Sequence, residues 1–238
     1  MDWLNLAHNI FMAIYTFMLV MVSIYGFHRY LLVFLYYRHR RNLPQPMGHF
    51  DELPRVTIQL PMFNERFVAR RIIEKTCEID YPREKLQIQV LDDSTDDTTE
   101  IARQAVEEAR LRGVDIEYIH RDDRSGYKAG ALENGLKTAK GEFVSIFDAD
   151  FIPRKDFLTR SIPYFTDPEV CVVQSRWEHL NRNDSLLTRT QAIYLDGHFA
   201  IEHVARNRSK RFMSFNGTAG TWRISAIRAA GGWHHDTL

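Results

Sequence analysis

The 238-residue chain is poor in the features that mark several protein classes. It has two cysteines, Cys77 and Cys171, which lie far apart in the sequence and match no metal-ligand spacing. This excludes a disulfide framework and predicts a reduced domain without functional thiols. There is no internal repeat and no low-complexity run. Net charge is zero, with 31 basic and 31 acidic residues, so the overall electrostatics do not favour nucleic acid as a partner.

Charge is absent from Ile10 to Phe27, a run close in length to the apolar segment that spans a bilayer. A second apolar piece, Tyr30 to Tyr37, follows after His28 and Arg29. Together the two pieces exceed one straight span, which predicts that the second tilts or lies in the membrane interface. The run follows no Lys or Arg and precedes no small-residue cleavage site, which argues against a signal peptide.

The charges that flank this run predict its orientation. Only Asp2 precedes it, whereas four arginines follow its apolar core: Arg29, Arg38, Arg40 and Arg41. By the positive-inside rule, everything after Tyr37 then lies in the cytoplasm. We therefore expect a membrane anchor over residues 1–41, and a linker over residues 42–54, which are rich in Pro and Gly.

From Val56 onward the pattern alternates between strands and helices. Strands separated by helices of this length predict a mostly parallel, Rossmann-like sheet with right-handed crossovers and helices on both faces. The last part of the chain adds a short strand, a long helix rich in aromatic and charged residues, and a Gly-containing segment. The expected strands are Val56–Leu60, Gln87–Leu91, Val114–Ile119, Phe143–Phe147 and Val170–Gln174. The expected helices are Phe67–Ile79, a helix from about Asp96 to Arg112, Tyr127–Ala139 and Leu186–Arg206, and the Gly-containing segment is Phe212–Trp222.

The predicted strand Phe143–Phe147 ends on two carboxylates, Asp148 and Asp150. Alternate residues of an extended chain share a face, so both can point the same way. Two carboxylates bind a hard divalent cation that also bridges substrate phosphates, and open α/β sheets bind ligands at this edge. The alternative is a solvated turn after a strand, because the D-x-D pattern alone is common by chance.

Two other strand ends and one helix start carry polar groups. Pro61 to Glu65 follows the first strand, and Asp92-Asp93-Ser94 follows the second, where an acidic group suits a ribose hydroxyl or a base N–H. For Asp92-Asp93 a helix-capping role is an equal alternative. Arg124 to Gly130 opens a helix with two glycines and Lys128, which suits a diphosphate, although an ordinary capped helix start also fits.

As an ordered set, these motifs resemble those of family 2 inverting glycosyltransferases with the GT-A fold. The resemblance covers residues 55–238, which we take as one catalytic domain. Later motifs are similar to those of the cellulose-synthase-like branch, most of all its β-mannan, glucomannan and xyloglucan-backbone synthases. These motifs are Val173–Trp177, Asp196–Phe199 and Phe215–Arg223.

The resemblance implies a role for each motif. Asp93, with Asp92, would contact the nucleobase; Pro61 and Glu65 would lie near the nucleoside. Lys128 would hold the diphosphate, and Asp148 with Asp150 would hold Mg²⁺ or Mn²⁺ on it. A further set would line the acceptor channel: Gln174, Trp177, Phe215, Asn216, Gly217 and Trp222.

The implied function is transfer of a sugar from a nucleotide-sugar to a growing β-glycan at a plasma, inner or Golgi membrane, with the catalytic domain in the cytoplasm. UDP-glucose and GDP-mannose both fit as donors. Two alternatives stay open: a non-processive transferase acting on a lipid carrier, and a nucleotide-sugar-binding module without catalysis. Nucleic acid is not expected as a partner.

The chain departs from the family after Gly231-Gly232-Trp233. The family's general base belongs to a Thr-Glu-Asp motif at this point, but the sequence continues His234-His235-Asp236 and ends at Leu238. We therefore expect no catalytic base before Leu238, and an inactive donor-binding fragment; Asp236 is a poor substitute. The Gln-x-x-Arg-Trp motif is absent too. His198 and His203, five residues apart, are expected on different helix faces, with a structural or solvated role rather than metal ligation.

Overall fold

A computed structural model describes residues 3–234 of the chain. The described residues fall into two compact units, which are treated separately: one within Met1–Pro44 and Glu178–Ser214, the other within Gln45–Trp177 and Phe215–Leu238. Residues 178–214 were expected in the catalytic domain, but their contacts group them with the N-terminal helix. In order along the chain the elements are α1 (Trp3–His39), β1 (Val56–Met62), α2 (Ala69–Cys77), η1 (Arg83–Lys85), β2 (Leu86–Asp92), α3 (Thr98–Leu111), β3 (Ile116–His120), α4 (Tyr127–Leu136), β4 (Phe143–Ile146), α5 (Phe157–Ser161), η2 (Ile162–Thr166), β5 (Val172–Gln174), α6 (Leu186–Asp196), η3 (Gly197–His203), α7 (Val204–Arg208), β6 (Gly220–Arg223) and α8 (Ile224–Ala229).

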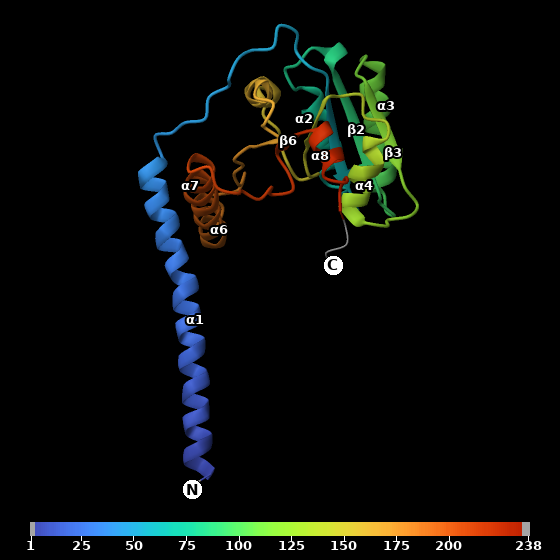
Figure 1. Ribbon diagram of the computed structural model, residues 1–238. Coiled ribbons are helices and arrows are strands. Elements are labelled where there is room, and N and C mark those ends of the chain that lie inside the picture. The colour runs from blue at the N-terminus through green and yellow to red at the C-terminus, as the bar shows by residue number, and fades with distance from the viewer. Residues whose placement is uncertain (1–2, 235–238) are drawn as a thin grey trace. The chain divides into compact units, whose positions relative to one another are not determined.

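The second unit is built on a six-stranded sheet with the order β3-β2-β1-β4-β6-β5 (Figure 1). The first four strands are mutually parallel, as the alternating pattern predicts. β6 runs antiparallel to both β4 and β5. The sheet is therefore mixed, and the prediction of a mostly parallel GT-A-like sheet is confirmed. The Gly-containing segment was not expected to supply a strand between β4 and β5.

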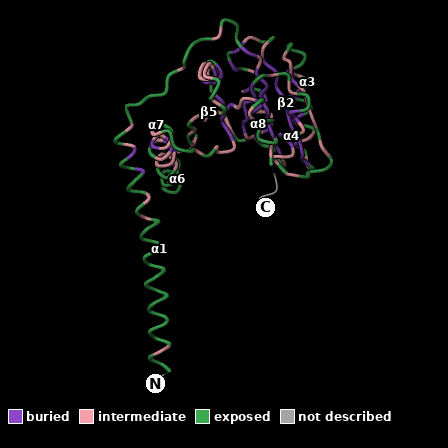
Figure 2. Tube along the Cα trace, in the orientation of Figure 1, coloured by how far each residue is buried: buried purple, intermediate pink, exposed green. Residues whose placement is uncertain are grey.

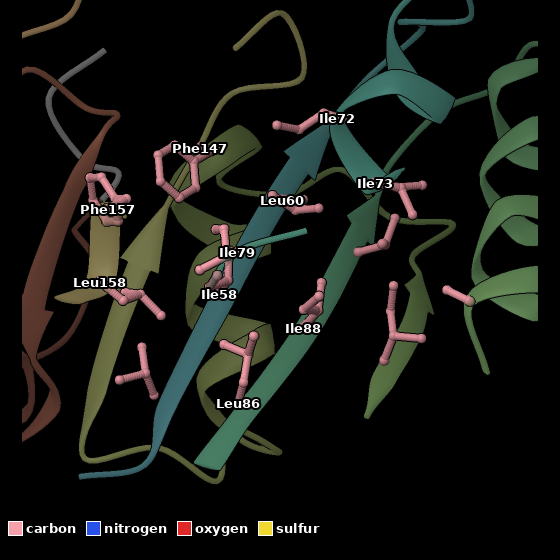
Figure 3. Close-up of a cluster of buried hydrophobic side chains, with 14 of the residues drawn as sticks. Ile58, Leu60, Ile72, Ile73, Ile79, Leu86, Ile88, Phe147, Phe157 and Leu158 are labelled. Carbon is pink, nitrogen blue, oxygen red and sulfur yellow. The ribbon is translucent and has the colours of Figure 1, made fainter. Parts of the chain in front are cut away.

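One face of the sheet carries the main hydrophobic core. Ile58 and Leu60 of β1, with Ile88 of β2, point toward Ile72 and Ile73 of α2 (Figure 3). Helices α3 and α5 pack on the same face. These side chains are fully buried, and each contributes about 1.5–3 kcal/mol when removed from water. β1, β2 and β4 are buried along their whole length, and the buried residues in Figure 2 gather in this unit.

The opposite face is covered by α4 and α8 and contains a polar layer. Gln59 donates to Gln89 over 3.0 Å, and the Thr57 hydroxyl donates to Gln87 over 2.8 Å. Helix α4 comes so close that a Cβ at Gly135 would lie 2.4 Å from the Gln59 amide nitrogen. Helices therefore cover both faces, as predicted, and this layer fixes the height of α4 above the sheet.

The other unit contains α1, a single uninterrupted helix of 37 residues. It is the one helix within residues 3–234 that is long and apolar enough to cross a membrane, and nearly all of it is exposed (Figure 2). The two apolar pieces of the sequence are thus joined without a break. Near its C-terminal end, Leu32 and Leu35 pack on Ala205, and Arg29 pairs with Glu202 over 3.1 Å.

The long helix expected over Leu186–Arg206 is present, but a π-helical stretch, Gly197–His203, interrupts it. A π-helical turn brings residues five apart together. The rings of His198 and His203 accordingly lie 4.3 Å apart, so the expectation of different helix faces was wrong. Burial lowers the pKa of His203 to about 4, so the ring is neutral at pH 7.

Candidate functional site

The loops after β1 and β2 are joined at the carboxyl edge of the sheet. Asp93 donates its amide to the Met62 carbonyl over 3.1 Å. Asn64 donates its amide to the Ser94 hydroxyl over 2.8 Å, and its side chain accepts from the Thr95 amide over 2.9 Å. Asn64 has a φ of 56°, a conformation that Asn tolerates better than most residues. The two predicted motifs, Pro61–Glu65 and Asp92–Ser94, therefore form one connected surface.

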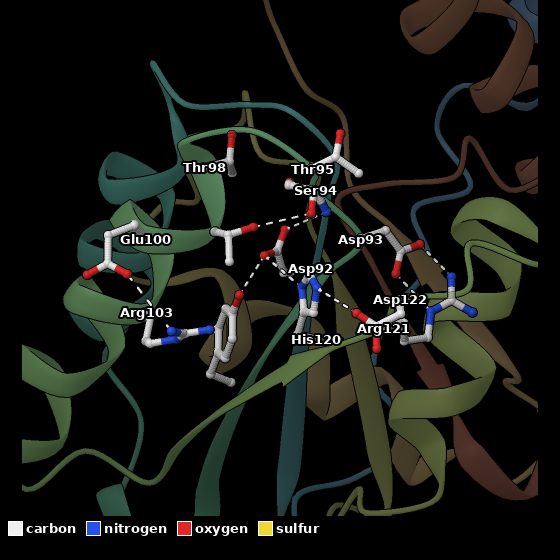
Figure 4. A network of polar contacts seen from close by, with 12 residues as sticks. Asp92, Asp93, Ser94, Thr95, Thr98, Glu100, Arg103, His120, Arg121 and Asp122 are labelled. Atoms are coloured by element: carbon white, nitrogen blue, oxygen red, sulfur yellow. Dashed lines mark hydrogen bonds and ion pairs between the residues drawn. The ribbon is translucent and has the colours of Figure 1, made fainter.

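Asp92 is fully buried and serves as the acceptor at the centre of a hydrogen-bond network (Figure 4). It accepts from the Ser94 amide over 2.9 Å and the Tyr118 hydroxyl over 2.6 Å. The Nδ1 atom of His120 lies 3.3 Å from the same carboxylate. Burial, with the Asp92 hydrogen bond, raises the pKa of Tyr118. Because it has no exposed surface, Asp92 supports the loop and offers no contact to a ligand in this structure.

Asp93 forms an ion pair with Arg121, from the loop after β3 (Figure 4). The Arg121 Nε donates to one carboxylate oxygen over 2.8 Å, and its Nη2 binds the other. The Asp93 carboxylate raises the pKa of Arg121. Arg121 also donates to the Ser125 and Tyr127 carbonyls, over 3.2 and 3.1 Å. Sequence analysis did not single out Arg121, because no spacing in the sequence connects it to Asp93.

The loop that opens α4 is tightly folded. Gly126 has a φ of 70° and Tyr127 a φ of 48°, a region that only glycine adopts without strain. A Cβ at Gly130 would lie 2.1 Å from the Ser125 carbonyl oxygen. Glycine is therefore required at position 130 for this turn. The Arg124 guanidinium lies over the Phe63 ring, 3.4 Å from its centroid, which adds a contact between the loops after β1 and β3.

Lys128 meets Asp148, in agreement with the resemblance, which implies that both residues act at the diphosphate. The Lys128 ammonium binds the Asp148 carboxylate and donates to the Gly217 carbonyl over 2.9 Å. The Asp148 amide donates to the Thr218 hydroxyl over 3.0 Å. Three segments far apart in sequence thus converge at the end of β4. The Thr218 contact was not anticipated, because the antiparallel placement of β6 brings it there.

Glu65 and Asp150 are exposed and Asp148 is partly exposed, and the charges of Asp150 and Asp148 are close enough to act on Glu65. Burial, followed by the charges of Asp150 and Asp148, raises the pKa of Glu65. Residues 3–234 contain no cluster of three or more His, Cys, Asp or Glu placed to hold a metal. Two carboxylates fit a hard cation whose remaining ligands come from phosphate oxygens and water. The negative charge that acts on Glu65 makes the same point suitable for a cation.

The residues expected to line the acceptor channel are held largely by contacts among themselves and with the core. The Gln174 amide donates to the Thr218 carbonyl over 3.0 Å and accepts from the Asn216 amide over 3.0 Å. The rings of Phe215 and Trp222 lie 5.2 Å apart, and Trp177 packs on Phe151 at 5.4 Å. Gly217 takes a φ of 83°. All six are partly exposed, and acceptor binding by them stays a prediction. The general base was expected after Leu238, and Asp236 also lies outside the described residues.

Replacing Glu65 by Gln is expected to stabilise the metal-free protein at pH 7 and to lose this advantage below pH 4. A carboxyl whose pKa is raised by folding costs folding free energy once it ionises, so the native chain loses stability as pH rises through this window. Glutamine removes that loss. Thermal unfolding with chelator at both pH values measures the difference.

Glu108→Gln is the control with opposite sign. Arg70 lowers the pKa of Glu108 through a hydrogen bond, so ionised Glu108 stabilises the fold above its ordinary pKa. Its replacement should lower the melting temperature at pH 7 and have little effect in acid. A lower melting temperature for Glu65→Gln at pH 7 would contradict the repulsion inferred at the site.

The fold and the arrangement of acidic strand ends define a glycosyltransferase of the GT-A type. The model of the family described as Glycosyl transferase family 2 matches residues 57–226. The chain belongs to this family.

Curated relatives indicate which members of the family the chain is similar to. The chain is 46% identical over 189 residues to Glucomannan 4-beta-mannosyltransferase 9 of Arabidopsis thaliana, a match that covers 77% of this chain and 36% of the relative. Glucomannan 4-beta-mannosyltransferase 1 of Oryza sativa subsp. japonica is 46% identical with the same coverages. The chain thus spans about a third of the length of these relatives. Sequence analysis had identified the same branch.

Among solved structures, a mannosyltransferase from Pyrobaculum calidifontis, in complex with GDP-Man and Mn²⁺, is 26% identical. It superimposes with a TM-score of 0.68, over 90% of this chain and 58% of that chain. The S. aureus protein TarS, in complex with UDP-GlcNAc, is 19% identical with a TM-score of 0.51, over 74% of this chain and 47% of that one. At this identity the second likeness concerns the fold alone.

Proposed function

We propose that this chain binds GDP-mannose and forms the donor side of a membrane-bound β-mannosyltransferase that elongates a mannan or glucomannan chain. The observation that carries the proposal is the convergence of Lys128, Asp148 and the segment around Gly217 at the end of β4. The relatives at 46% identity are glucomannan mannosyltransferases, and the archaeal mannosyltransferase binds GDP-Man with Mn²⁺. These favour GDP-mannose over UDP-glucose.

In this proposal the diphosphate lies at the start of α4. Lys128 donates to it, in exchange for part of its contact with Asp148, because an ammonium forms strong charge-assisted hydrogen bonds with phosphate oxygens. Asp93 accepts from the nucleobase and Glu65 borders the nucleoside, while Pro61, which is buried in β1, supports the end of the strand. The partly exposed rings of Trp177, Phe215 and Trp222 offer flat apolar faces to the sugars of the acceptor.

Asp148 and Asp150 would hold a divalent cation, Mn²⁺ or Mg²⁺. When bound, the cation neutralises charge on the leaving diphosphate, which is the chemistry that such an ion supplies in group transfer. Lys128 places a second positive charge on the same group, so developing charge is stabilised from two sides. Glu65 stays close enough to both carboxylates for its own charge to respond when a cation neutralises them.

The chain is expected to bind GDP only in the presence of Mn²⁺ or Mg²⁺. Calorimetric titration of GDP and UDP, with metal and with chelator, tests this on the whole chain in detergent micelles. GDP should bind more tightly than UDP. In Asp150→Ala, added metal should no longer increase the affinity for GDP, because the cation loses one of its two protein ligands.

Asp51→Asn is the matched control, since the Asp51 side chain is fully exposed and, within residues 3–234, its ion pair is with exposed His49, over 3.5 Å. It should leave metal-dependent binding unchanged. Equal GDP affinity with and without metal, in a folded protein, would count against the site.

We propose that α1 spans a membrane, with residues from Pro54 onward in the cytoplasm. The support is its apolar length and the arginines at its C-terminal end, Arg38, Arg40 and Arg41. In sealed vesicles with the cytoplasmic face inward, a C-terminal tag should be protected from added protease and an N-terminal tag should be digested. The reverse pattern would overturn the orientation, and digestion of both tags would exclude a span.

A further inference from the structure

Arg121 stands between the two halves of the proposed donor site. On one side it binds both oxygens of Asp93, and on the other it donates to the carbonyls of Ser125 and Tyr127. We propose that Arg121 is a positioning residue that couples nucleobase binding at Asp93 to diphosphate binding at Lys128. This inference rests on the proposed function, since it concerns how the same site works.

Nearly all N–H donors of the Arg121 guanidinium are used in these hydrogen bonds. Of its five N–H donors, four have protein acceptors, because Nε and Nη2 bind Asp93, Nη2 also binds Tyr127 and Nη1 binds Ser125. Its side chain is 15% exposed and that of Asp93 is 4% exposed. The Arg121 amide adds a bond to the Asp92 carbonyl over 3.1 Å. A planar, fixed fork of this kind holds its partners at a set separation.

The carbonyls that Arg121 holds belong to the part of the chain that sets the position of Lys128. Tyr127 directly precedes Lys128, and both Gly126 and Tyr127 have positive φ. For Tyr127 this is a strained conformation that surrounding contacts must stabilise. The Arg121 bond to the Tyr127 carbonyl is such a contact. When Arg121 moves, the loop can relax, and the Lys128 ammonium leaves the place where it meets Asp148.

Asp93 can still accept a ligand while it is bound to Arg121. A carboxylate has about four lone-pair sites, and the guanidinium occupies one on each oxygen. A nucleobase that presents N–H groups can use the remaining sites. Because Arg121 then bridges the base-binding carboxylate and the phosphate-binding loop, the two parts of the nucleotide are bound as one unit. The alternative is that Arg121 only neutralises a buried carboxylate.

Pyrophosphate distinguishes a coupling role of Arg121 from simple neutralisation of Asp93, because pyrophosphate occupies the diphosphate site without a base. The experiment measures the dissociation constants of GDP and of pyrophosphate, each with Mn²⁺, for the whole chain in micelles. Asp93→Asn should weaken GDP about tenfold and leave pyrophosphate within about twofold. Arg121→Lys and Arg121→Gln should weaken both ligands about tenfold. Lysine keeps the charge that Asp93 needs, but cannot reach both carbonyls at once.

Arg103→Gln is the control, since the Arg103 guanidinium lies over the Tyr118 ring in the same region, 5.6 Å from its centroid, and its side chain is 57% exposed. It should leave both constants unchanged. If the two Arg121 variants bind pyrophosphate normally, Arg121 serves only Asp93 and the coupling is wrong. If the unsubstituted chain binds neither probe, the proposed function fails as well, so the two failures are distinguished. Circular dichroism of Arg121→Lys separates lost binding from lost folding.

Discussion

Lys128→Met is expected to weaken the binding of Mn²⁺-GDP about 10- to 100-fold. A hydrogen bond to a charged group contributes about 1.5–3 kcal/mol, and about 1.4 kcal/mol corresponds to a factor of ten in affinity. Methionine keeps much of the unbranched apolar stem but has no ammonium, so the loss reports the charge. Titration calorimetry of GDP, with the metal in excess, measures the effect.

The same substitution is expected to strengthen the binding of Mn²⁺ alone. Without nucleotide, the Lys128 ammonium binds the Asp148 carboxylate and competes with any cation for it. Opposite signs for metal and nucleotide are not produced by a general loss of structure, which would weaken both.

Lys137→Met is the matched control, because Lys137 directly follows the same helix and its ammonium donates to the exposed Asn134 side chain over 3.2 Å, away from Asp148. It should change neither constant. Unchanged GDP affinity in Lys128→Met would exclude the diphosphate role.

The sequence was sufficient to predict the parallel half of the fold. Strands separated by helices of this length predict the parallel order of β1 to β4. Burial alone would not have done so, because β1 and β2 are buried along their whole length although they alternate apolar residues with Thr57, Gln59, Gln87 and Gln89. The placement of β6 between β4 and β5 could not be predicted in this way. It depends on pairing between Ile146 and Gly220, residues far apart in the sequence, which no local pattern encodes.

The residues of the candidate site also fall into those that the sequence predicts and those that it does not. Asp148, Asp150 and Lys128 follow strand ends or open a helix, so their meeting at one edge follows from the topology of parallel strands. Arg121 and Thr218 were missed. Each acts through a side chain that reaches across from another element, Arg121 to Asp93 and Thr218 to the Asp148 amide. Such partners can be identified only from distances in the structure, because their spacing in the sequence does not connect them.

Neighbouring acidic residues can also have separate roles, as the different burial of Asp92 and Asp93 indicates. Asp92 and Asp93 were interpreted together as base contacts. In the structure Asp92 is fully buried, whereas Asp93 is 6% exposed, and we propose that only Asp93 contacts the base. Asp92→Asn is therefore expected to destabilise the fold by about 2–4 kcal/mol, which corresponds to a fall in melting temperature of roughly 5–15 °C.

The physical reason is the set of donors that Asp92 accepts. Tyr118, His120 and the Ser94 amide all point at its carboxylate. An asparagine offers one acceptor oxygen and turns two N–H groups toward this set of donors, so a buried donor loses its partner. Asp93→Asn should cost less stability, since its partner Arg121 keeps two backbone acceptors.

Thermal unfolding of both variants, with Asp97→Asn as control, measures the difference. Asp97 has an 81% exposed side chain and a long ion pair with Arg66, so its replacement should change the stability by less than about 0.5 kcal/mol. If Asp92→Asn is stable but no longer binds GDP, Asp92 contacts the ligand and its assignment to structural support is wrong. A destabilised Asp92→Asn protein beside a stable Asp93→Asn protein that binds GDP weakly would assign structural support to Asp92 and base recognition to Asp93.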